Sequence, residues 1–189
     1  MGTLHGQQPY YPYYGIGLFV FLLVHIVQGL MLWNQNHKAR PIKYEVNKAN
    51  TNSTWYSRSM GLLGTLILLF LVLHLYHFWT PSRFGGIAGI HPLEETTLSP
   101  EYNNQAVHNL YYEMQTVFQG HLWVVIVYVL GVISLCWHLI HGFQSAFQTL
   151  GINHKKYTPI IKGLGIAYAI IICLLFAAMP IAIYGGWIA

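Results

Sequence analysis

The chain has 189 residues, of which 54% are hydrophobic and only 7% are charged. A soluble globular domain carries about 25% charged residues, so this composition excludes an ordinary soluble domain and indicates an integral membrane protein. The formal net charge is +4, and the nine basic residues form no stripe of the kind that binds nucleic acids.

Four apolar stretches are long enough to cross a bilayer, which takes about 20 helical residues. They predict membrane spans over residues 13–33, 59–79, 121–147 and 160–184. Trp33, Trp79 and Tyr184 lie near the ends of these spans, where aromatic rings favour the membrane interface. The expected fold class is an all-α integral membrane protein, a transmembrane helical bundle that forms a single domain over residues 1–189.

The connections between the spans differ in charge. Eight of the nine basic residues lie between the first two spans or around the turn between the last two: Lys38, Arg40, Lys43, Lys48, Arg58, Lys155, Lys156 and Lys162. The connection between the second and third spans holds Arg83 and four of the five acids. The positive-inside rule therefore predicts that both basic connections are cytoplasmic. The first residues would then lie outside without any export signal, so we expect a further N-terminal helix to precede this sequence in the native chain.

Histidines inside the spans are the candidate functional residues, because polar groups in hydrocarbon are costly and usually mark a functional interior. By helical rise, His25 and His141 lie in the inner half of the membrane on different helices, whereas His74 lies in the outer half. A depth-matched pair on two helices is typical of the axial ligands of a haem iron. The alternative is hydrogen bonding between helices, which is favoured for His77, His121 and His138. His138 is then a packing residue or a neighbour that supports His141.

The neighbours of these histidines allow a flat cofactor. Gly29 follows His25 by one helical turn, and Gly142 follows His141 directly, although ordinary helix packing explains a single glycine equally well. Ser57 and Arg58, at the cytoplasmic start of the second span, are candidates for contacts with haem propionates. Arg58 also fits a plain positive-inside anchor. The HLYH and HLIH spacings alone are too weak to indicate a zinc centre.

Three stretches of the sequence resemble a known protein family. The stretches HIVQGLMLWNQNHKARPIKY (25–44), STWYSRSMGLLGTLILLFLVLHLYHFW (53–79) and HLIHGFQSAFQTLG (138–151) are similar to the single-chain, di-haem cytochrome b subunit of succinate dehydrogenase and fumarate reductase. The likeness is to the b558-type subunits of Bacteroidetes-like bacteria that use menaquinone, and it runs from about residue 15 to the end. It identifies residues 1–189 as one transmembrane cytochrome b domain.

The resemblance implies a membrane anchor subunit of succinate:menaquinone oxidoreductase (complex II) or quinol:fumarate reductase. Such a subunit has five transmembrane helices and two b haems, lies in the bacterial cytoplasmic membrane, and docks an iron-sulfur subunit and a flavoprotein on its cytoplasmic side. Succinate chemistry takes place on the flavoprotein, so no catalytic residue is expected in this chain. Electrons pass through the haems to or from a quinone, for which the sequence marks no binding residues.

Carried over by position, the resemblance makes His25 and His141 the ligands of the inner haem and His74 one ligand of the outer haem. The second outer ligand comes from an N-terminal helix in the family, and that helix has no counterpart here. His5, His77 and His121 are conceivable substitutes.

Two further alternatives of function stay open. One is the di-haem cytochrome b anchor of a hydrogenase or formate dehydrogenase, and the other is a haem-free membrane scaffold or transporter. Some di-haem relatives carry a glutamate two residues before the ligand aligned with His141, where this chain has Leu139. We therefore predict no transmembrane proton pathway through that position.

Overall fold

The computed structural model describes residues 11–39, 51, 53–87, 89–102, 104 and 106–188 of the chain. These residues fall into two units, Met1–Ser53 and Thr54–Ala189, and the position of one unit relative to the other is not determined. Each unit is therefore described by itself. The expectation of a single domain over residues 1–189 stays a prediction.

The first unit contains helix α1, Tyr11–Lys38. Its residues Gly15–Lys38 are apolar and long enough to cross a membrane. The sequence predicted that this span ends at residue 33, but the helix continues to Lys38, because apolarity marks the hydrocarbon crossing and the polar residues that follow can extend the helix beyond it. The basic residues Arg40, Lys43 and Lys48 lie outside the described residues.

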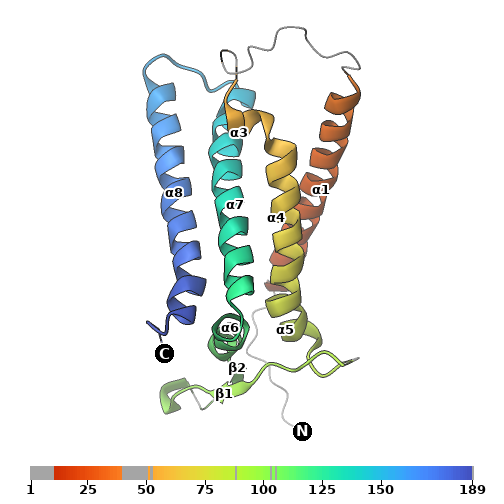
Figure 1. Ribbon diagram of the computed structural model, residues 1–189, viewed down its shortest axis with the longest axis vertical. Coiled ribbons are helices and arrows are strands. Elements are labelled where there is room, and N and C mark those ends of the chain that lie inside the picture. The colour runs from red at the N-terminus through yellow and green to blue at the C-terminus, as the bar shows by residue number, and fades with distance from the viewer. Residues whose placement is uncertain are drawn as a thin grey trace. The chain divides into compact units, whose positions relative to one another are not determined.

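The second unit contains long helices along its length and a group of short elements at one end (Figure 1). Its helices are α3 (Trp55–Arg58), α4 (Met60–His74), the π-helix η1 (Leu75–Trp79), α5 (Thr80–Phe84), the 3-10 helix η2 (Pro100–Tyr102), α6 (Leu110–Gln119), α7 (Leu122–Thr149) and α8 (Tyr157–Tyr184). Strands β1 (Glu95–Thr97) and β2 (Ala106–His108) form an antiparallel pair, with Thr96 opposite Val107.

Three segments of this unit, Met60–Phe84, Leu122–Thr149 and Tyr157–Tyr184, are also long and apolar enough to cross a membrane. Together with α1 they confirm the four predicted spans as apolar helices, and the chain is a helical multi-pass membrane protein. The second span runs five residues beyond the predicted end at residue 79, and the fourth begins three residues before the predicted start at residue 160. The short strands β1 and β2 were not predicted from the sequence.

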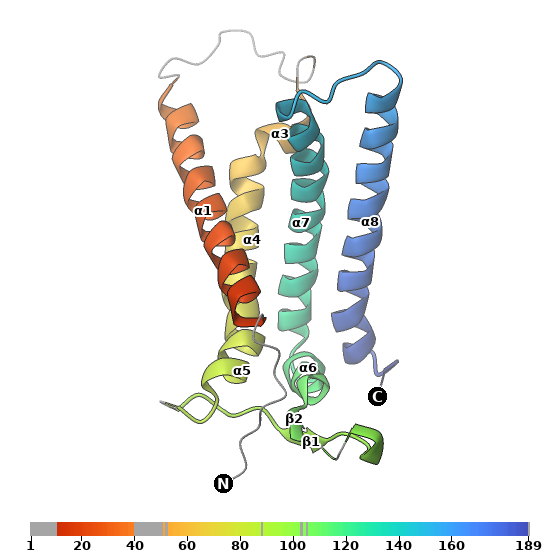
Figure 2. The ribbon, with the colours of Figure 1, turned by 180° about the vertical axis from the view of Figure 1, so that it is seen from behind.

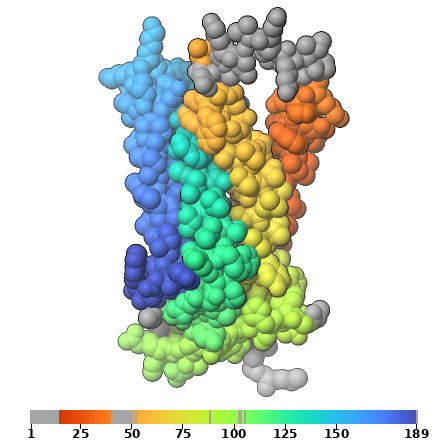
Figure 3. Space-filling view, viewed as in Figure 1, coloured from red at the N-terminus to blue at the C-terminus, as the bar shows by residue number. Residues whose placement is uncertain are grey.

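Helix α7 lies between α4 and α8 in both ribbon views (Figures 1 and 2). Two buried glycines allow this close packing. A Cβ atom at Gly131 of α7 would lie 2.5 Å from Cγ of Phe70 on α4, and one at Gly165 of α8 would overlap the ring of Phe143 on α7. The space-filling view shows the three long helices side by side along their length (Figure 3).

The second span changes its helical winding after His74. In the π-helix η1 the N–H of Thr80 donates to the carbonyl of Leu75, five residues back, instead of four. Pro81 follows directly, and a proline has no N–H to donate and collides with the carbonyl four residues before it. The wider π turn accommodates the proline ring without ending the helix. Such insertions often occur at functional sites.

Charged residues separate to the two ends of the second unit. The end that holds α3 and the α7–α8 connection carries Arg58, Lys155, Lys156 and Lys162, and we call it the basic end. The opposite end holds α5, α6, β1 and β2, and we call it the acidic end; its charged residues are Arg83, Glu94, Glu95, Glu101 and Glu113. This separation along the bundle is the arrangement that the positive-inside rule requires.

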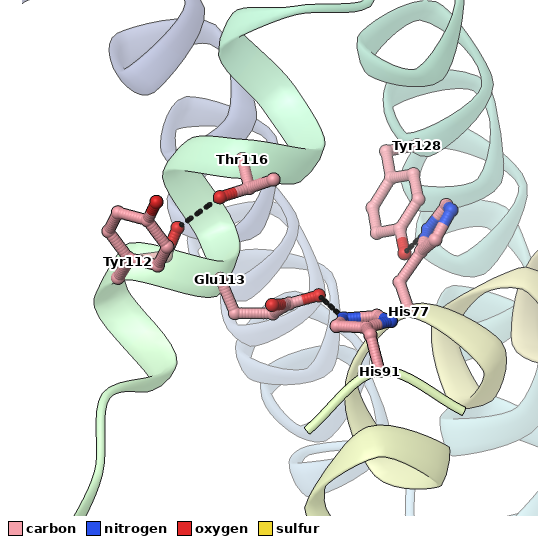
Figure 4. Close-up of polar contacts among 6 residues, drawn as sticks. All are labelled: His77, His91, Tyr112, Glu113, Thr116 and Tyr128. Carbon is pink, nitrogen blue, oxygen red and sulfur yellow. Dashed lines mark hydrogen bonds and ion pairs between the residues drawn. The ribbon is translucent and has the colours of Figure 1, made fainter. Parts of the chain in front are cut away.

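The acidic end also contains a tightly packed core. Phe118 of α6, Val125 and Tyr128 of α7 and Ile183 of α8 are buried against one another. Glu113 of α6 is buried beside this core, with only 7% of its side chain exposed, and its Oε1 atom lies 3.0 Å from Nε2 of the exposed His91 (Figure 4). The buried carboxylate therefore has a hydrogen-bonding partner from the loop that precedes β1.

Candidate functional site

His141 lies on α7 towards the basic end, within a group of aromatic rings. Its imidazole is half-buried, and the ring of Tyr56 on α3 stands edge-on to it at 6.2 Å between centroids. Tyr56 in turn stacks on Trp137, one helical turn before His141, at 5.4 Å and an interplanar angle of 21°. The short helix α3 therefore folds back against α7 and places the Tyr56 ring beside His141.

The predicted propionate contacts lie on the same short helix. Ser57 and Arg58 directly follow Tyr56, the residue that contacts His141, and Ser57 is half-buried while Arg58 is exposed. The fold thus brings the short helix that carries both residues to the level of His141. The propionate role itself stays a prediction.

The glycines near the candidate ligands are of two kinds. Gly131 and Gly165 are covered by phenylalanine rings and serve helix packing. A Cβ added at Gly142, directly after His141, or at Gly29 of α1 would meet nothing within 4 Å among the described atoms. Helix packing within either unit therefore does not account for Gly29 or Gly142.

His138 has a different environment from His141. Its Nδ1 atom is shielded from solvent, and its Cε1 atom would lie 3.9 Å from a Cβ atom at Gly64 of α4. The side chain therefore packs at the α4–α7 contact. This position agrees with the packing role that the sequence favoured for His138.

His74 ends α4, immediately before the π-helix. Its side chain is exposed. Three aromatic rings lie near its imidazole, at centroid distances of 5.3 Å for Phe78, 5.8 Å for Phe70 and 6.2 Å for Tyr128 of α7. The His74 imidazole thus has aromatic rings on the side that faces the bundle and is open on its other side. This arrangement is compatible with a flat apolar group bound at the open side.

His77 already has a hydrogen-bonding partner. Its Nδ1 atom lies 2.9 Å from the hydroxyl of Tyr128, and the two rings stack at 5.9 Å with an interplanar angle of 22° (Figure 4). This contact fits the interhelical hydrogen bond that the sequence favoured for His77. Of the other substitutes for the outer ligand, His121 is exposed at the start of α7 beside Trp123, and His5 lies outside the described residues.

The two candidate ligands of the second unit lie at different levels of the bundle. His74 is beside Tyr128, and His141 follows Tyr128 on the same helix by 13 residues. At the α-helical rise of 1.5 Å per residue this separation is roughly 20 Å along α7. One iron atom cannot bind both imidazoles, so a haem at each would be a separate haem.

The predicted partner of His141 lies in the first unit. His25 is an exposed residue of α1, near the middle of that span, and Gly29 follows it by one turn on the same helix. The fold of each unit is compatible with one axial ligand of the inner haem, His25 in the first unit and His141 in the second. The pairing of His25 with His141 stays a prediction, because the two units are not placed relative to each other.

Within the described residues, no group of three histidine, cysteine, aspartate or glutamate side chains is arranged to hold a metal ion. A closed zinc site takes four protein ligands and a catalytic one takes three, so this part of the chain offers no such centre. A haem iron takes only axial side chains, and the porphyrin supplies the other ligands. The finding therefore does not bear on haem binding.

Three features of the site were missed from the sequence. They are the π-helix after His74, the stack of Tyr56 on Trp137, and the contact between His91 and Glu113. Only the first has a local signal, which is Pro81 inside an otherwise continuous apolar helix. Comparison with protein families, with curated proteins and with solved structures found no match.

The hydrogen bond between His77 and Tyr128 yields a test of local stability. Changing Tyr128 to phenylalanine is expected to lower the free energy of unfolding by about 1 kcal/mol, because it removes one hydrogen bond and keeps the packed ring. Reversible unfolding in detergent measures this change. Tyr76→Phe is the matched control, since Tyr76 lies beside His77 but is 68% exposed. Equal effects of the two variants would show that the hydrogen bond contributes nothing.

Proposed function

We propose that this chain is the haem b-containing membrane anchor subunit of a succinate:menaquinone oxidoreductase or quinol:fumarate reductase. The observation that carries the proposal is the placement of His74 and His141, on different helices of one bundle and roughly 20 Å apart in level. Two histidines so separated suit two haems stacked across a membrane. The sequence resemblance supports the same assignment.

The chain's own residues would hold and orient the haems. His141 and His25 would be the axial ligands of the inner haem, and Tyr56 would limit rotation of the His141 imidazole. Arg58 and Ser57 would meet the propionates at the basic end. His74 would supply one axial ligand of the outer haem, and Phe70 and Phe78 would pack beside its ring. When bound, the haems supply one-electron transfer between the iron-sulfur partner and the membrane quinone.

The basic end is the side on which the partner subunits would dock. By the positive-inside rule this end faces the cytoplasm. Exposed Leu150 and Ile152 lie there in the same connection as Lys156, so the surface combines apolar and cationic groups. An iron-sulfur subunit docked at this end would be nearest to His141, and electrons would reach the inner haem first.

Co-purification tests the identity of the complex. A tag on this chain, used to isolate it from its native membrane in mild detergent, is expected to recover a flavoprotein and an iron-sulfur protein, and succinate should reduce the bound haem. Recovery of a hydrogenase or formate dehydrogenase instead would assign the chain to another respiratory complex. Recovery of a haem-free chain would favour the scaffold or transporter alternative.

A further inference from the structure

A surface cavity lies at the basic end of the second unit, where α7 connects to α8. Its volume is about 450 Å³, and its lining comes from the connection and from the first turns of α8. The lining residues are Asn153, His154, Lys155, Thr158, Pro159 and Lys162. No part of the proposed haem sites uses these residues.

Two lysines give this cavity its charge. Lys155 and Lys162 line it, and every carboxylate in the described part of the second unit lies at the acidic end, on the far side of the bundle. Two of the neutral polar groups have local partners: His154 Nδ1 accepts from the backbone N–H of Lys156, and Thr158 Oγ1 accepts from that of His154. The cavity therefore offers mainly cationic groups, which select an anion.

Lys156 lies next to the cavity in the sequence but does not line it. Its ammonium group is 5.8 Å from the centre of the Tyr157 ring, within the range of a cation–π contact. The three lysines of this connection thus have different environments. Lys156 provides a control of equal charge for any test of the cavity.

The cavity lies at the membrane surface. Lys162 is half-buried and follows the start of the fourth span, Tyr157, by five residues. Exposed Pro159 and Ile166 lie three residues before and four residues after it, on the same face of the helix, so the cavity borders apolar surface of the fourth span. A ligand with a phosphate group and attached acyl chains would meet the lysines and these apolar side chains together, whereas free phosphate would use only the lysines.

We propose that this cavity binds the phosphodiester headgroup of an anionic phospholipid, with Lys155 and Lys162 contacting the phosphate. Basic pockets at the cytoplasmic membrane surface are suited to such headgroups, and each nearby lysine contributes about 1 kcal/mol, or roughly a fivefold change in affinity. The proposal needs only the membrane topology and does not depend on haem binding.

The test uses the whole protein in nanodiscs or micelles. Bound phospholipid is counted by native mass spectrometry after titration with phosphatidylglycerol, with phosphatidylcholine, or with inorganic phosphate. The wild type is expected to retain phosphatidylglycerol in preference to phosphatidylcholine, and the double variant Lys155→Gln, Lys162→Gln should bind it roughly 30-fold more weakly. Lys156→Gln should bind like the wild type, and Lys162→Arg, which keeps the charge, should retain most of the affinity.

Several results would overturn the proposal. Equal losses in Lys156→Gln and in the double variant would show that the connection attracts lipid only through its total charge. If inorganic phosphate displaced the lipid and stabilised the protein as much as phosphatidylglycerol does, the cavity would be a site for free phosphate. Unchanged lipid binding with loss of a co-purifying acidic protein would make the surface a protein interface. Because haem content is measured on the same samples, failure here is distinguishable from failure of the proposed function.

Discussion

Changing His141 to alanine is expected to remove the inner haem completely. An alanine supplies no ligand, and among the described residues of the second unit the nearest histidine on α7, His138, packs at the contact with α4 by Gly64. In the proposed pairing the inner haem iron takes two axial imidazoles, so the loss of one is expected to release the haem. The pyridine haemochrome assay measures haem per chain, and the reduced-minus-oxidised spectrum shows which component is lost.

Two variants are controls for this result. His138→Ala should keep the inner haem, because the role inferred for His138 is packing. His74→Ala should remove a different spectral component, since His74 lies roughly 20 Å from His141 along α7. Loss of the inner haem from His138→Ala, with His141→Ala unaffected, would reverse the ligand assignment.

The second large effect is expected at the packed glycines. Gly131→Ala and Gly165→Ala should each lower the free energy of unfolding by about 1–3 kcal/mol, because the new methyl group meets a phenylalanine ring and forces the helices to shift. Phe70 is the ring at Gly131 and Phe143 is the ring at Gly165, so the α4–α7 and α7–α8 contacts are tested separately. Reversible unfolding in mixed detergent micelles gives the change in free energy.

Gly163→Ala is the matched control for the packed glycines. It lies on α8, two residues before Gly165, and a Cβ atom there meets nothing within 4 Å among the described atoms. Because alanine is the better helix former, this variant should be neutral or slightly stabilising. Destabilisation of Gly163→Ala as large as that of Gly165→Ala would show that the helix contact is not the cause.

The sequence predicted the membrane helices well, for a physical reason. An apolar run of about 20 residues has few alternatives to a membrane helix, since backbone hydrogen bonds must be satisfied within the bilayer. The ends were less well predicted: helix α1 passes Trp33 and reaches Lys38, and the second span passes Trp79 and reaches Phe84. An aromatic residue marks the membrane interface, but the helix can continue through it.

The contacts of the candidate histidines were harder to predict. The cost of an imidazole in hydrocarbon indicates that His77 and His138 each need a partner, so an interhelical contact could be inferred for each. The sequence does not reveal that Tyr128 is the partner of His77, because that depends on how η1 and α7 rotate against each other. The same holds for Tyr56, which contacts His141 only because α3 turns back against α7. These details are set by tertiary packing rather than by local sequence.

The quantity that tests the central claim most directly is the haem content of the purified full chain, measured by its reduced-minus-oxidised absorption spectrum. The account predicts a Soret band and an α band in the b-haem region, with the α band split because two haems occupy different environments. These bands should be lost in part in His141→Ala. Purified, folded protein without any reducible Soret band would contradict the account and leave its histidines as packing residues of a haem-free bundle.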